Sequence, residues 1–118
     1  MINNFEDLKV AKLAHKFTLS IYKLAHNLPS TEKYRLVDQI CRSASSVPAN
    51  IIEGHSRKSK KEFIQFLYQA RGSLAETQYH LLLSKDLGMI SEAIYNELIV
   101  ESDEIGRMVS GLIKYLKQ

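Results

Sequence analysis

Apolar residues recur every three or four positions in four separate stretches of the chain, and this spacing is the strongest constraint on its fold. The stretches cover residues 10–28, 37–52, 63–81 and 94–116. Such a repeat places the apolar side chains on one face of an α-helix, and no stretch alternates strictly enough to indicate a strand. Because short links make neighbouring helices antiparallel, the sequence predicts an all-α fold, an up-down-up-down antiparallel four-helix bundle that forms one domain over residues 1–118.

Residues at the ends of these stretches predict where the helices begin and end. Ser59 and Glu62 form the S-x-x-E pattern of a capping box at the start of the third helix. Gly88 is expected to end that helix and Ser91 to cap the fourth. Ser30, after a proline, is expected to cap the second helix.

A proline interrupts the second helical stretch. Pro48 removes one backbone hydrogen bond and collides with the carbonyl of Ala44, at a cost of about 3 kcal/mol unless the helix adapts. The second helix is therefore predicted to kink or break near residues 45–48. Ser45 or Ser46 is expected to satisfy the freed backbone groups.

Polar side chains follow the face of this helix that is opposite the core. Arg42 and Ser46 lie before the kink, and Asn50 and Glu53 continue the face if the kink is modest. Two interpretations are open. These residues form a polar functional site, or they form a hydrogen-bond network that stabilises the kink or a contact between subunits.

The same region resembles a known family. The segments RSASSVPANIIEG, SKKEF and GSLAE resemble the signature of a bacterial four-helix-bundle family, the 23S rRNA intervening-sequence proteins, and the resemblance extends over nearly the whole chain. The structural residues of the motif are Arg42, Ser46, Pro48, Asn50, Glu53 and Gly54. Ala11 and Ile52 depart from the usual pattern.

The resemblance implies a homo-oligomer, typically a pentameric ring, with no established catalytic activity. It also implies an origin in reading frames within inserts of ribosomal RNA genes. A distant relative is the accessory protein of diversity-generating retroelements, a basic pentamer that binds nucleic acid and a reverse transcriptase. The expected partners are therefore further copies of this chain, RNA or DNA, and a protein partner.

The third helix carries more apolar surface than one core requires. Besides its core stripe, a second stripe lies on the adjacent face at about 100° per residue. A helix in an isolated bundle buries one stripe, so the second predicts a contact between subunits. The alternative is a broad core face with exposed tyrosines. The residues of the predicted interface are Ile64, Tyr68, Ala75, Tyr79 and Leu82.

Basic residues gather where the second helix meets the third. Positive charge at a helix N-terminus opposes the helix dipole, so helix stability does not explain this cluster. The bundle topology places the start of the first helix at the same end. A basic end could bind phosphate backbones, and the alternative is a solvated surface that keeps the protein soluble. The candidate nucleic-acid-binding residues are Lys9, Lys12, Lys16, Arg57, Lys58, Lys60 and Lys61.

Other classes of protein are not expected. The four histidines and the single cysteine, Cys41, lack metal-ligand spacing, and no nucleophile elbow or phosphate-binding glycine loop occurs. No apolar run reaches the length of a membrane helix, and the first residues do not read as a signal peptide. We expect a cytoplasmic, non-enzymatic protein without a cofactor that presents a basic surface to nucleic acid. The alternative is a structural or protein-interaction module that binds no nucleic acid.

Overall fold

The computed structural model describes residues 8–28 and 33–118 of the chain. Within these ranges it contains no strand and four α-helices, which are α1 (Lys9–His26), α2 (Asp38–Ser56), α3 (Lys60–Asp86) and α4 (Glu92–Lys117). A π-helical turn, η3 (Lys33–Val37), leads directly into α2. The prediction of an all-α helical bundle is confirmed.

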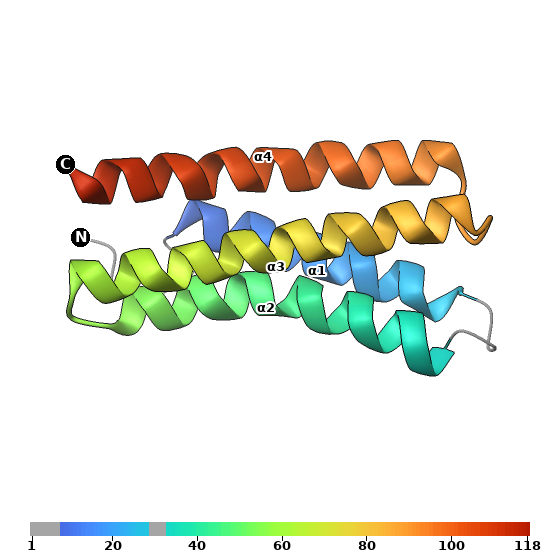
Figure 1. The fold of residues 1–118 in the computed structure, drawn as a ribbon, viewed down its shortest axis with the longest axis horizontal. Helices are drawn as coiled ribbons and strands as arrows, with labels where there is room; N and C mark the ends of the chain where they lie inside the picture. The colour runs from blue at the N-terminus through green and yellow to red at the C-terminus, as the bar shows by residue number, and fades with distance from the viewer. Residues whose placement is uncertain (1–7, 29–32) are drawn as a thin grey trace.

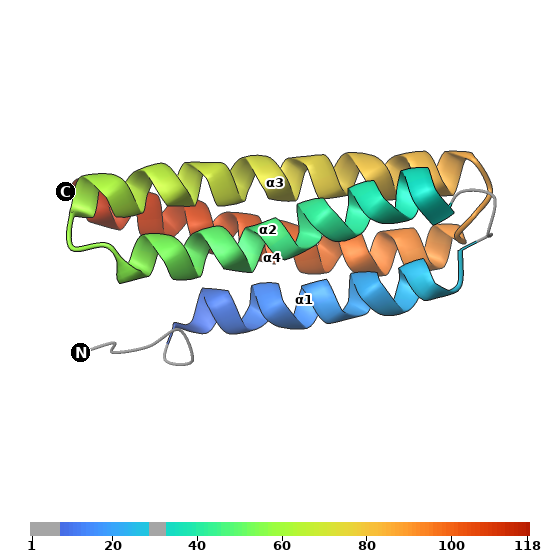
Figure 2. The ribbon, with the colours of Figure 1, turned by 90° about the horizontal axis from the view of Figure 1, so that it is seen from below.

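Consecutive helices lie side by side and run in opposite directions (Figure 1, Figure 2). The α2–α3 turn and the end of α4 lie at one end of the bundle, and the α3–α4 turn lies at the other. The helices differ in length: α3 has 27 residues and α4 has 26, whereas α1 has 18. At 1.5 Å per residue, α3 and α4 are each about 40 Å long. As a result, α1 begins short of the end that α3 and α4 reach (Figure 1).

The helix ends carry the caps that local sequence predicts. The Ser59 hydroxyl accepts a hydrogen bond from the Glu62 backbone N–H at 3.2 Å, and Ser91 caps α4 through the Ile94 N–H at 3.1 Å. Gly88 follows the end of α3 with a φ of 77°, a left-handed conformation that glycine adopts without strain. The predicted cap at Ser30 lies outside the described residues.

The core lies between the inward faces of all four helices. Each helix contributes side chains from one face, as the apolar spacing requires. Cys41 is half-buried beside this core, and burial followed by the negative charge of Asp38 raises the pKa of its thiol. The largest apolar side chains that are fully buried are Phe17, Ile21, Ile40, Val47, Ile51, Leu67, Leu81, Ile105 and Val109.

Pro48 lies inside α2, which continues past it without interruption. The Ala44 carbonyl, which cannot bond to a proline nitrogen, accepts a hydrogen bond from the Thr18 hydroxyl of α1 at 3.1 Å. Ser45 or Ser46 was the expected partner, but the Ser45 hydroxyl donates to the Arg42 carbonyl at 3.2 Å, and the Ser46 hydroxyl accepts from Asn50 and Ser73. The neighbouring helix therefore satisfies the backbone group that proline frees, and the chain does not break there. A kink of the α2 axis stays a prediction.

Candidate nucleic-acid interface

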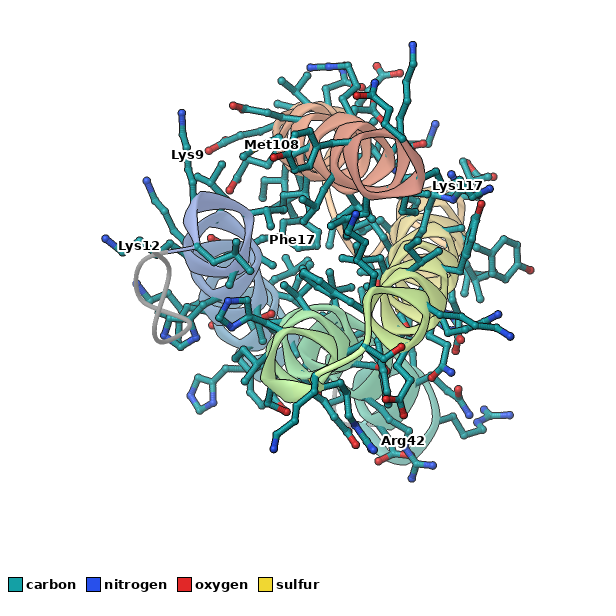
Figure 3. The ribbon with its side chains drawn as sticks, turned by 90° about the vertical axis from the view of Figure 1, so that its left-hand side faces the viewer. Lys9, Lys12, Phe17, Arg42, Met108 and Lys117 are labelled. Atoms are coloured by element: carbon teal, nitrogen blue, oxygen red, sulfur yellow. The ribbon has the colours of Figure 1, made fainter. Side chains whose placement is uncertain are left out.

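Three lysines lie in the α2–α3 turn and the first turn of α3, at the end of the bundle that faces the viewer in Figure 3. Lys58 is in the α2–α3 turn, and Lys60 and Lys61 are the first two residues of α3. All three side chains are exposed, and none forms an ion pair with another residue that the structure describes. Their charges are therefore not neutralised by the parts of the fold around them.

Arg57 is placed differently from these lysines. Its guanidinium contacts the carboxylates of Glu53 at 2.8 Å and Glu62 at 3.7 Å, and it lies 5.1 Å from the centre of the Phe66 ring. These contacts connect the end of α2 to the start of α3. The structure therefore gives Arg57 a role in holding the turn, and its predicted role in binding stays a prediction.

The lysines of α1 are also exposed, but they do not all join the basic end. Lys9 and Lys12 project from α1 on the side of the bundle away from Lys117 (Figure 3). Lys16 lines a groove between α1 and α4 together with Glu97 and Glu101. Lys9, Lys12 and Lys16 lie on one face of α1, and on this ground Lys16 was predicted to bind nucleic acid with the other lysines. The structure places Lys16 among carboxylates from α4.

The groove between α1 and α4 has a volume of about 710 Å³ and an acidic lining. Partial burial, followed by the negative charge of Glu97, raises the pKa of the Glu101 carboxyl, and Lys16 acts in the opposite direction. Val100 lies beside it with 66% of its surface exposed. Because carboxylates outnumber lysines in its lining, this groove does not favour the binding of phosphate.

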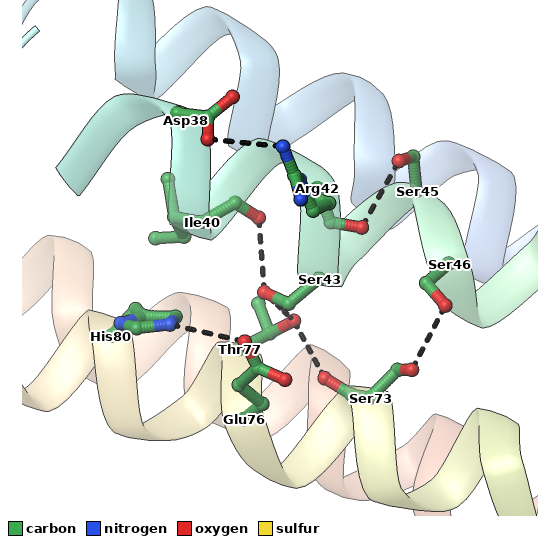
Figure 4. Close-up of polar contacts among 10 residues, drawn as sticks. All are labelled: Asp38, Ile40, Arg42, Ser43, Ser45, Ser46, Ser73, Glu76, Thr77 and His80. Atoms are coloured by element: carbon green, nitrogen blue, oxygen red, sulfur yellow. Dashed lines mark hydrogen bonds and ion pairs between the residues drawn. The ribbon is translucent and has the colours of Figure 1, made fainter. Parts of the chain in front are cut away.

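The polar residues of the family motif divide into two groups. Ser46 accepts a hydrogen bond from the Ser73 hydroxyl at 2.9 Å (Figure 4). It accepts another from the Asn50 side chain, also at 2.9 Å. Arg42 and Glu53 are exposed. Among the ion pairs that the structure describes, Arg42 contacts Asp38 of the same helix at 3.4 Å, and Glu53 contacts Arg57 in the turn after α2 at 2.8 Å. Ser46 thus lies within a contact between α2 and α3, and Asn50 bonds to Ser46 within α2.

A buried polar contact continues this seam between α2 and α3. The Thr77 hydroxyl lies 2.8 Å from that of Ser43, and Ser43 donates to the Ile40 carbonyl at 3.2 Å (Figure 4). Near the other end of the seam, a Cβ atom on Gly54 would lie 2.6 Å from the Cβ of Phe66. The motif glycine is therefore required because α2 and α3 approach closely at that point.

The predicted interface stripe of α3 is only partly exposed. Ile64 and Tyr68 are half-buried and pack against the core. Ala75 is exposed, and Tyr79 and Leu82 expose 57% and 37% of their surface. The second half of the stripe is therefore the part that is open to a partner.

An aromatic and cationic cluster was missed by the sequence analysis. Lys117 donates a hydrogen bond to the Tyr68 hydroxyl at 2.8 Å, and the Arg71 guanidinium lies 4.9 Å from the centre of the Tyr68 ring. The hydrogen bond from Lys117 lowers the pKa of the Tyr68 phenol, burial acts in the opposite direction, and the charges of Lys117 and Arg71 lower it further. The i, i+3 spacing of Tyr68 and Arg71 was the available signal.

Sites of other kinds were also considered. No three metal-ligating side chains lie together in the described ranges 8–28 and 33–118. Over the same ranges, no helix is both long and apolar enough to cross a membrane.

Comparisons with known proteins agree with the geometry. Residues 6–111 match the family model described as 23S rRNA-intervening sequence protein. A crystal structure from Bacteroides thetaiotaomicron, described as a protein with unknown function from the S23 ribosomal protein family, is 30% identical, with a TM-score of 0.81. The alignment covers 89% of this chain and 98% of that one. No curated protein matches the chain. On the family match over most of its length, this chain belongs to the 23S rRNA-intervening sequence protein family.

Proposed function

We propose that this protein is a cytoplasmic, non-enzymatic oligomer that binds nucleic acid through a basic surface. The observation that carries the proposal is the set of three exposed lysines, Lys58, Lys60 and Lys61, which lack ion-pair partners in the described parts of the chain. They lie at the positive end of the α3 dipole, where they cost stability instead of adding to it. Phosphate groups would neutralise this charge.

The chemistry of these side chains favours contacts with the nucleic-acid backbone. A lysine ammonium binds phosphate as a point charge and does not by itself read the edges of bases. We therefore expect binding with little sequence preference and a strong dependence on salt. Each lysine that contacts a phosphate contributes about 0.7 to the salt slope on single strands and about 0.9 on duplex DNA.

A salt titration of binding to RNA and DNA oligonucleotides tests the proposal. The Lys58→Ala, Lys60→Ala and Lys61→Ala triple variant is expected to bind more weakly, with a salt slope smaller by about 2 to 3. The matched control removes three positive charges elsewhere, in a Lys23→Ala, Arg42→Ala and Lys85→Ala variant. No binding by the wild type at about 50 mM salt, or equal effects of the two triple variants, would refute the proposal.

Self-association is the second part of the proposal. Tyr79 and Leu82 expose apolar surface on the second half of α3, away from the basic end. We propose that copies of the chain associate there, with five subunits favoured by the family resemblance, so that the basic ends repeat around one face. Light scattering tests this proposal, and a monomer at micromolar concentration contradicts it. A wild-type oligomer that binds no nucleic acid would favour the alternative, a protein-interaction module.

A further inference from the structure

A second positively charged surface lies in the groove between α3 and α4. The groove has a volume of about 460 Å³, and its lining includes Arg71 and Gln78 from α3 and Asp103, Arg107 and Ser110 from α4. The side chains of both arginines are exposed. The groove is therefore open to a ligand and presents two guanidinium groups to it.

The protein balances the positive charge of this groove only in part. Asp103 is the carboxylate of the lining, and it accepts a hydrogen bond from the Gln78 amide at 2.9 Å. Neither Arg71 nor Arg107 forms an ion pair with a residue in the described part of the chain. An anion that entered the groove would not have to displace a carboxylate from either arginine.

Arg71 is already held in position for an anion. Its guanidinium lies 4.9 Å from the centre of the Tyr68 ring and donates one hydrogen bond to the Ser110 hydroxyl at 3.2 Å. A guanidinium has five N–H donors in a rigid plane, so most of them stay available. Because the side chain is ordered before binding, less conformational entropy is lost when it contacts a phosphate.

The groove continues the surface formed by the lysines at the end of the bundle. Arg71 is 11 residues beyond Lys60 on α3, a distance of about 16 Å along the helix axis. Lys61, Tyr68 and Arg71 lie within about 80° of one another around α3, at 100° per residue. At about 3.4 Å per nucleotide in a duplex strand, this length corresponds to about five phosphates.

We propose that the α3–α4 groove binds the sugar–phosphate backbone of the same nucleic acid strand that contacts the lysines, with Arg71 and Arg107 each donating hydrogen bonds to a phosphate. This inference rests on the proposed function and adds a defined path for the strand. The strand passes from the α2–α3 turn along α3 and over the Tyr68 side chain.

The test compares binding of a fluorescein-labelled oligonucleotide of about 20 nucleotides, as RNA, DNA and duplex DNA. An Arg71→Gln and Arg107→Gln variant is expected to bind about ten- to thirtyfold more weakly at about 0.1 M salt, with a salt slope smaller by about 1.4 to 1.8. The control is a Lys23→Gln and Lys85→Gln variant, which removes the same charge from the opposite end of the bundle and is expected to bind like the wild type. Inorganic phosphate serves as a competitor that has no backbone.

The pKa of Tyr68 provides a second readout. Lys117 lowers this pKa, and a phosphate that attracts Lys117 and adds negative charge nearby is expected to raise it. Absorbance titrations of the wild type and of a Tyr68→Phe variant, with and without the DNA oligonucleotide, isolate the Tyr68 transition from those of the other tyrosines. A higher pKa in the presence of DNA supports the path across the groove.

The outcomes separate the groove from the proposed function. If the arginine variant binds like the wild type while the lysine variant is weakened, the groove is excluded and the proposed function stands. If the wild type binds no oligonucleotide, both are wrong. If the arginine substitutions change the oligomeric state with no loss of binding by the variant, the groove is an intersubunit contact and this inference is overturned. The inference is also overturned if millimolar inorganic phosphate competes with the oligonucleotide while the arginine substitutions leave the salt slope unchanged.

Discussion

The hydrogen bond from Thr18 to the Ala44 carbonyl predicts that Thr18 and Pro48 are energetically coupled, although they lie in different helices. Pro48 deprives the Ala44 carbonyl of its helical N–H donor, and Thr18 supplies a hydroxyl in its place at 3.1 Å. Both Ala44 and Thr18 are buried, with 0% and 8% of their surface exposed, so water cannot readily replace the bond. A Thr18→Val substitution should therefore leave a buried carbonyl unsatisfied.

The magnitude of this effect depends on what residue 48 is. In the wild type, loss of the hydroxyl is expected to cost about 1–3 kcal/mol, the penalty for a buried polar group without a partner. In a Pro48→Ala background, the N–H of residue 48 can bond to the Ala44 carbonyl, and Thr18→Val should cost about 1 kcal/mol or less. The Thr18 hydroxyl shares its single proton between the Ala44 carbonyl and the Ala14 carbonyl, which lies 2.8 Å away, and of the two only the Ala14 carbonyl has a helical N–H partner. The expected coupling energy is about 1–2 kcal/mol.

A double-mutant cycle measures this coupling. The free energies of unfolding of the wild type, the two single variants and the double variant are obtained from urea denaturation at one protein concentration, followed by circular dichroism. The sign of the Pro48→Ala effect is not needed, because the cycle cancels the gain in helix propensity and any cavity left by the ring.

Thr77→Val is the matched control, because the Thr77 side chain is also buried but its hydroxyl contacts Ser43 and the Ser73 carbonyl. Its cost should be the same with Pro48 or Ala at residue 48. If Thr18→Val and Pro48→Ala are additive to within about 0.3–0.5 kcal/mol, the hydroxyl does not substitute for the missing backbone donor and the reasoning is wrong.

Substitutions at four further positions test the packing, capping and electrostatics of the fold. Gly54→Ala should destabilise the protein by about 1–3 kcal/mol, because the new methyl group would lie 2.6 Å from the Cβ of Phe66. Gly72→Ala, which meets nothing within 4 Å, should stabilise it by about 0.5–1 kcal/mol, and equal effects at the two glycines in thermal unfolding would contradict the account. Ser59→Ala should cost about 1 kcal/mol through loss of the α3 cap, whereas Ser59→Asp should retain most of the stability in urea unfolding. Because the folded pKa of Glu101 is raised, its ionised form is disfavoured in the folded state, so Glu101→Gln should stabilise the protein at pH 7 by less than about 1 kcal/mol. That gain should disappear as the pH falls through the folded pKa to below the ordinary value of 4.5, and an equal gain at pH 4 and pH 7 would exclude this explanation.

Features that depend on one helix were predicted well from the sequence. The cap at Ser59 requires only a hydroxyl and an N–H three residues later, and Gly88 requires only a left-handed conformation after the last turn. The core faces followed from the spacing of apolar residues, since the buried side chains of α1 and α4 repeat at helical intervals. Each of these features is determined over a few residues, so no knowledge of the neighbouring helix was needed.

Features that depend on how two helices meet could not be predicted in this way. The helical face of α1 groups Lys16 with the other lysines, but α4 brings Glu97 and Glu101 beside it. The contact of Arg57 with Glu62 was missed for a related reason, because Glu62 lies across a turn whose geometry sets the distance, whereas the i, i+4 spacing of Glu53 and Arg57 was a local signal. The position of Lys117 over Tyr68 requires the register of α4 against α3, which periodicity does not specify.

The family motif is explained mainly by the contacts of α2 with its two neighbours. Pro48 depends on Thr18 of α1, Ser46 contacts Ser73 of α3, and Gly54 lets α2 approach Phe66 of α3. In this chain these residues join α2 to α1 and α3, and they leave little of their chemistry free for a ligand. The lysines at the start of α3 and the arginines of the α3–α4 groove have the opposite character, because none of them forms an ion pair within the described residues. Substitution of Arg71 or Lys60 should therefore weaken nucleic-acid binding and leave stability almost unchanged. If binding depended on the motif and not on these cations, substitution of Asn50 would instead weaken binding in proportion to its effect on stability.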